Sequence, residues 1–211
     1  MIRRAILPPS LIAAFLLQTH GAFALEGYRV YESTAASVNG EVLFLSDMTR
    51  EACFLRCAAM PGSEPESLTP EEVRNRLIAD TLVLQEQRKL ALGQVDNAVL
   101  SAYGKEALER MAACGSSCKA GIGPAETRDW VMRKLLVREF FSQRVAVFVE
   151  VKDEDVARET RRRVAAEGDS GVTEDQVREE LQEAKVAEEV RNWFNRAASK
   201  ARIVLSPMEE K

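Results

Sequence analysis

Histidine is almost absent from this sequence, because the 211 residues contain only His20, close to the amino terminus. Imidazole is the commonest general base and a frequent metal ligand. Its scarcity excludes Ser-His and Cys-His nucleophile pairs, and histidine-ligated metals, from the rest of the chain. We therefore expect no enzyme, no catalytic residue, no metal and no cofactor.

Long apolar runs are missing after residue 24. Residues 1–24 have the plan of a secretory signal: a basic start, an apolar run from Ala5 to Leu17, and the small-x-small cleavage site Ala22-Phe-Ala24. The run is shorter than a membrane span needs. We expect cleavage between Ala24 and Leu25, which leaves a mature periplasmic protein without stable membrane insertion.

An excess of positive charge is also lacking. The chain has 29 basic and 33 acidic residues, a formal net charge of −4. Two of the arginines, Arg3 and Arg4, lie in the expected signal, so the mature chain is more acidic still. Because like charges repel, nucleic acid and anionic membranes are not expected as partners.

A hairpin pattern is present at Ala36–Asp47. Asn39-Gly40 tolerate positive φ and stand between two segments that favour strands. Ser46 or Asp47 is expected to cap the helix that follows. Far along the chain, Ala201–Leu205 reads as a strand without a nearby partner. Since a two-stranded hairpin gains most from a third strand, we predict that this segment and the hairpin form one small sheet.

Between the hairpin and the final strand the pattern is helical. Start and stop signals and apolar spacing predict helices over residues 47–60, 70–92, 96–113, 124–148, 152–163 and 173–201. The helix over 124–148 is apolar on more than one side, which favours a central place in the core. The last helix has one apolar face, which we expect to be buried against the earlier helices. The predicted fold class is mainly α with a small β-sheet.

Taken in order, these segments resemble the chaperone domain of the SurA group of periplasmic proteins, related to the SurA, PrsA and trigger-factor families. The resemblance rests on Ala36–Asp47, Val73–Gln85, Arg133–Glu139, Val151–Val156 and the closing helix of Trp193 with residues 201–205. It implies a single SurA N-terminal-type helical domain over 25–211, with a core at 35–151 and a C-terminal helix and strand at 173–205.

The chain departs from this family in one respect. Family members often carry parvulin-type prolyl isomerase domains between the Val151 region and the last helix. Only about twenty residues separate Val151 from Val172, whereas even a small domain needs about 50. The resemblance thus implies an ATP-independent chaperone without an isomerase domain. Its expected clients are unfolded or extended polypeptides, chiefly outer-membrane protein precursors. A non-catalytic scaffold that binds one partner is the alternative, and a peptidyl-prolyl isomerase is less favoured.

Five aromatic side chains are the candidates for client binding: Phe140, Phe141, Phe148, Trp193 and Phe194. Ordinary core packing is the competing interpretation of each. Exposure to solvent favours binding, because exposed apolar surface marks interaction sites.

The four cysteines form two pairs of equal spacing, Cys53 with Cys57 and Cys114 with Cys118. An even number in an exported protein indicates disulfides. Within a helix, Cys53 and Cys57 lie on one face, and the direction of their Cβ atoms disfavours a bond between them. We prefer Cys53 with Cys118 and Cys57 with Cys114, for segments that run antiparallel. A four-thiolate zinc site and a redox pair remain as alternatives.

Overall fold

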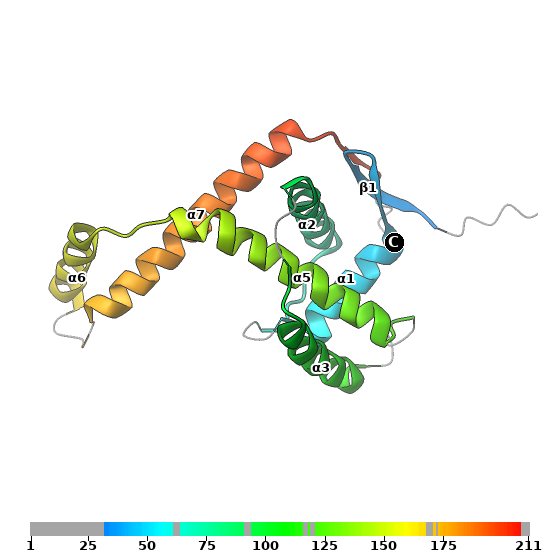
Figure 1. Cartoon of the computed structure of the whole chain (residues 1–211), viewed down its shortest axis with the longest axis horizontal. Coiled ribbons are helices and arrows are strands. Elements are labelled where there is room, and N and C mark those ends of the chain that lie inside the picture. Colours follow the sequence, from blue (N-terminus) through cyan, green and yellow to red (C-terminus); the bar gives the residue numbers. More distant parts are fainter. Residues whose placement is uncertain are drawn as a thin grey trace, which may run out of the picture. The chain divides into compact units, whose positions relative to one another are not determined.

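The fold is mainly helical with one small antiparallel sheet, as predicted (Figure 1). It is a computed structural model that describes residues 32–60, 64–90, 94–115, 118, 121–167, 171 and 173–207. The expected signal and its cleavage site lie outside the described residues.

The elements follow the predicted order along the chain. The strands are β1 (Thr34–Val38), β2 (Glu41–Phe44) and β3 (Ile203–Leu205). The helices are α1 (Leu45–Cys57), α2 (Pro70–Leu90), α3 (Asn97–Ala113), α5 (Pro124–Arg144), the 3-10 turn η1 (Ala146–Phe148), α6 (Asp153–Glu167) and α7 (Glu174–Lys200).

The start of α1 and the end of α5 differ from the prediction. Phe44 occupies the position before α1, and its N–H donates to the Asp47 carboxylate at 2.9 Å. Asp47 therefore acts from the third helical position, and neither it nor Ser46 is the N-cap. Helix α5 ends at Arg144, and η1 follows. Val145, the residue after α5, has a φ of −123°, which lies outside the helical range. Its β-branched side chain has a lower helix propensity, which favours an end here.

The sheet joins the two ends of the fold, which confirms the prediction. The strand order is β2-β1-β3, with Val38 opposite both Glu41 and Ile203. The hairpin turns through positive φ at Asn39 (53°) and Gly40 (90°). The Asn39 N–H donates to the Arg202 carbonyl at 2.8 Å, so the turn also anchors the approach to β3.

Among the described residues, two apolar clusters form the core. The first packs the inner face of the sheet on α2, with Ala36, Val38, Leu43, Met48, Val73, Leu77, Ile78 and Leu82 buried. The second joins α1, α3 and α5 through Phe54, Leu55, Ala58, Leu100, Ala107, Met111, Trp130, Val131 and Leu135. Phe54 and Trp130 stack with ring centroids 4.9 Å apart. Helix α1 contributes to both clusters and ties them together.

Helix α7 buries part of its apolar face. Near its start Val177 is fully buried, and α6 packs against this helix. Near its end Trp193 and Ala197 pack on the first cluster. Between these contacts Ala184 and Ala187 are exposed. The apolar face of α7 is therefore buried against other elements near both ends of the helix, as expected, and part of it is exposed between them.

Candidate functional site

The end of α5 meets α7 through four of the five candidate aromatics, here called the aromatic cluster: Phe140, Phe141, Trp193 and Phe194. Phe140 and Phe141 lie 5.0 and 5.5 Å from Trp193, centroid to centroid, in edge-to-face geometry. Phe194 lies 5.2 Å from Phe141 and from Trp193. Such pairs add about 0.5–1.5 kcal/mol each beyond burial, so the cluster fixes α7 on the helical body.

The candidates differ sharply in exposure. Phe140 is 1% exposed and belongs to the core. Phe141, Trp193 and Phe194 are half-buried. Phe148 lies in η1 and is 76% exposed, and its neighbour Val147 is 66% exposed. Core packing therefore accounts for Phe140, whereas Phe148 has the solvent exposure that client binding requires.

Phe148 lines a hollow of about 460 Å³ between η1 and α7, here called the α5–α7 hollow. Val145, Val149 and Trp193 add apolar surface. Its rim carries both charge signs, from Arg144, Lys185 and Arg196 and from Glu150, Glu188 and Glu189. Apolar side chains beside charges of both signs suit a polypeptide better than a ligand of one charge.

Side chains of α7 hold the wall of this hollow in place. Gln182 donates to the Val149 carbonyl at 3.0 Å, and Lys185 donates to the Glu150 carbonyl at 3.2 Å. Lys185 also bonds Asp155 of α6 at 3.2 Å. The segment after η1 is thus fixed by hydrogen bonds to α7, and Phe148 projects from a supported backbone.

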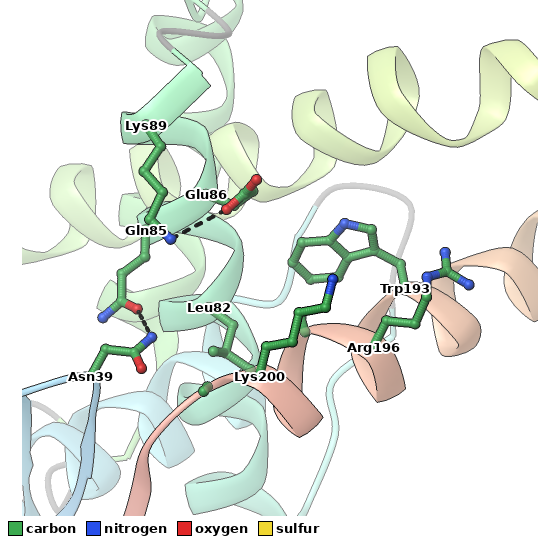
Figure 2. A pocket seen from close by; sticks show the side chains of 10 residues that line it. Asn39, Leu82, Gln85, Glu86, Lys89, Trp193, Arg196 and Lys200 are labelled. Carbon is green, nitrogen blue, oxygen red and sulfur yellow. Dashed lines mark hydrogen bonds and ion pairs between the residues drawn. The ribbon is translucent and has the colours of Figure 1, made fainter.

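A smaller pocket of about 240 Å³ lies on another side of Trp193, between α2 and α7, and is here called the α2–α7 pocket (Figure 2). It shares Trp193 and Arg196 with the α5–α7 hollow. The hairpin turn contributes Asn39, whose amide donates to Gln85 at 2.8 Å. The two cavities therefore meet at one tryptophan.

A buried ionic network lies elsewhere, between α1, α2 and α5. Lys134 Nζ is 2.6 Å from Glu51 Oε1 and 2.5 Å from Asp80 Oδ2. Glu51 is 1% exposed and also accepts the Trp130 indole N–H at 2.9 Å. Burial raises the pKa of Asp80, and the Lys134 ammonium opposes that rise. One lysine thus compensates two carboxylates, and the network joins three helices.

The cysteines form the disulfides Cys53–Cys118 and Cys57–Cys114, the pairing preferred from the sequence, with Cα atoms 5.4 and 5.6 Å apart. They tie α1 to the turn after α3. The sulfurs of Cys57, Cys114 and Cys118 lie within 4.8 Å of one another. A sulfur in a disulfide is not a thiolate ligand, so the zinc alternative requires both bonds to be reduced.

Sequence reasoning missed the ionic network and the cations of the α2–α7 pocket. Lys134 follows Trp130 by one helical turn, and this placement of a lysine on an apolar face was the available signal. Arg196 and Lys200 gave no such signal, since basic residues are common on an exposed helix face.

The comparisons with known proteins found no match, either to a family model or to a curated protein. Within the described part of the chain, no helix is both long and apolar enough to cross a membrane.

Proposed function

We propose that this protein is an exported, ATP-independent chaperone that binds unfolded or extended polypeptides at the α5–α7 hollow. The sequence resemblance to SurA-type domains supports the activity. The two disulfides support export to the periplasm, because such bonds persist in oxidising compartments.

The exposure of Phe148 is the observation that carries the proposal. A phenylalanine that is 76% exposed beside a hollow of about 460 Å³ can make apolar contacts with an unfolded polypeptide. Each such contact is weak, and weak contacts allow release without ATP. The rim supplies both charge signs for polar groups of the client.

Outer-membrane protein precursors are the proposed clients. Strands of membrane β-barrels alternate apolar and polar side chains. An extended segment of this kind places every second side chain against Phe148 and Val147, while the others face the charged rim. A continuous apolar segment would leave that rim unpaired, at a desolvation cost.

The test is suppression of aggregation of a urea-unfolded porin at stoichiometric ratio, followed by light scattering. We expect the native protein to suppress scattering and Phe148→Ser to lose most of this effect at unchanged thermal stability. Phe44→Ser is the matched control, because Phe44 is an exposed aromatic that lines neither cavity. No suppression by the native protein, or equal loss in both variants, contradicts the proposal.

A scaffold that binds one folded partner is the second candidate. Val42 of β2 and Val204 and Leu205 of β3 are 41, 49 and 52% exposed on the two edge strands, and a partner surface would cover them. Crosslinking in cells distinguishes the two, because a scaffold yields one complex and a chaperone yields many. A prolyl isomerase is the third alternative, and a proline-peptide assay without rate enhancement excludes it.

A further inference from the structure

The α2–α7 pocket combines an apolar floor with a cationic rim. Leu82 of α2 and Trp193, Ala197 and Ala201 at the end of α7 supply the apolar surface. The rim carries Lys89, Arg196 and Lys200 against one acid, Glu86. The volume, about 240 Å³, is below the roughly 300–1,000 Å³ of small-molecule sites. It has room for a single residue of a peptide.

Two of the three cations have no acidic partner among the residues that the structure describes. Lys89 lies 3.5 Å from Glu86. Neither Arg196 nor Lys200 has an ion pair with a described residue, and Lys200 and Trp193 both line the pocket (Figure 2). Unpaired positive charge next to apolar surface favours a ligand that carries a carboxylate.

Hydrogen bonds within the protein hold the opposite wall of the α2–α7 pocket in place. Asn39 donates to Gln85, and Gln85 donates to the Val38 carbonyl at 2.9 Å and to Glu41 at 3.2 Å. The side-chain amide oxygen of Asn39 (Oδ1) accepts the Arg202 backbone N–H at 2.9 Å. These bonds join the hairpin, α2 and the segment before β3. A fixed wall reduces the entropy lost on binding.

We propose that the α2–α7 pocket binds the C-terminal residue of a polypeptide, with its apolar side chain against Leu82 and Trp193 and its α-carboxylate at Lys200. A C-terminal residue carries its side chain and its α-carboxylate on the same Cα. This arrangement suits a pocket whose apolar floor and cationic rim are adjacent. An internal Asp or Glu would need a second residue for the floor. Arg196, on the rim of the same pocket, adds positive potential. This inference rests on the proposed function, since the C-terminal residue belongs to the polypeptide client.

The test compares two forms of one fluorescein-labelled peptide, Ser-Gly-Ser-Gly-Ala-Phe, with a free or an amidated C-terminus. We expect the free acid to bind about tenfold more tightly to the full protein by fluorescence anisotropy, with a smaller ratio at high salt. In Lys200→Gln we expect the ratio of the two affinities to be close to one, and in Lys200→Glu we expect the amidated peptide to bind more tightly. Arg191→Gln keeps the native ratio, because this exposed residue of α7 lines neither cavity.

Equal binding of both peptides to the native protein, or a native ratio in Lys200→Gln, overturns the inference. Porin aggregation is measured in parallel. If the protein suppresses porin aggregation but binds both peptides equally, the C-terminal site is refuted and the chaperone proposal is not. Discrimination without suppression refutes the chaperone, and the pocket then serves the C-terminus of one specific partner.

Discussion

Lys134→Met tests directly whether the buried ionic network holds α1, α2 and α5 together. The substitution keeps an unbranched side chain of similar length but removes the cation that Glu51 and Asp80 share. Removing one partner of a buried ion pair costs about 3–5 kcal/mol. We expect about 3 kcal/mol, the low end, because the Asp80 side chain is still 18% exposed and can be hydrated. For a domain of this size, that loss lowers Tm by roughly 6–12 °C.

The loss in Lys134→Met also depends on pH in a definite direction. The pKa of Asp80 is raised by burial, so ionised Asp80 opposes folding, and stability is lost as pH rises through its folded pKa. Lys134 limits this rise in the native protein. Without Lys134, ionised Asp80 lowers the free energy of unfolding by more at neutral pH. The difference in stability between the variant and the native protein therefore narrows as the pH falls from neutrality and Asp80 becomes protonated.

Urea unfolding with intact disulfides, followed by circular dichroism, measures both effects. The double variant Glu51→Gln with Lys134→Met should cost less than Lys134→Met alone, because the glutamine side chain carries no charge and still accepts the Trp130 N–H. Lys89→Met is the control, since its exposed pair with Glu86 is worth less than about 1 kcal/mol. A loss below about 1 kcal/mol in Lys134→Met, or a loss that stays the same as the pH falls from neutrality, refutes the reasoning.

Three further predictions concern the sheet and the disulfides. Ile203→Asp should release β3 and lower stability by about 2–3 kcal/mol, because Ile203 packs on the first cluster; faster proteolysis after α7 would show it, and native-like resistance would contradict it. Replacing Cys53 and Cys118 by serine should cost less than the roughly 4 kcal/mol that the chain-entropy model gives for a lone bridge over 65 residues, because Cys57–Cys114 still closes most of that loop. Urea unfolding measures this cost, and a cost near zero counts against the prediction. Dithiothreitol should reduce Cys57–Cys114 first, because this bond borders a surface cavity of about 500 Å³ whereas Cys53 and Cys118 are 5 and 3% exposed; peptide mapping with simultaneous reduction of both bonds would disprove it.

The sequence by itself determined the elements whose signals are local. Asn39-Gly40 specified the hairpin, and both residues have the positive φ that such a turn needs. The Asp96 side chain accepts the Ala98 N–H at 2.6 Å, and α3 begins where this cap predicts. Thr173 and Gln176 form the reciprocal bonds expected at the start of α7. Such features depend on residues within one turn of each other, so composition and spacing suffice to find them.

Only the tertiary structure decided which apolar and charged residues are buried. Phe140 and Phe148 belong to one apolar stretch, yet the first packs on Trp193 and the second faces solvent. Lys134 lies in the interior because Glu51 and Asp80 come from two other helices. Lys200 lies beside an apolar pocket because α7 ends against α2. In each case exposure depends on a segment far away in the chain, and spacing within one helix carries no information about that segment.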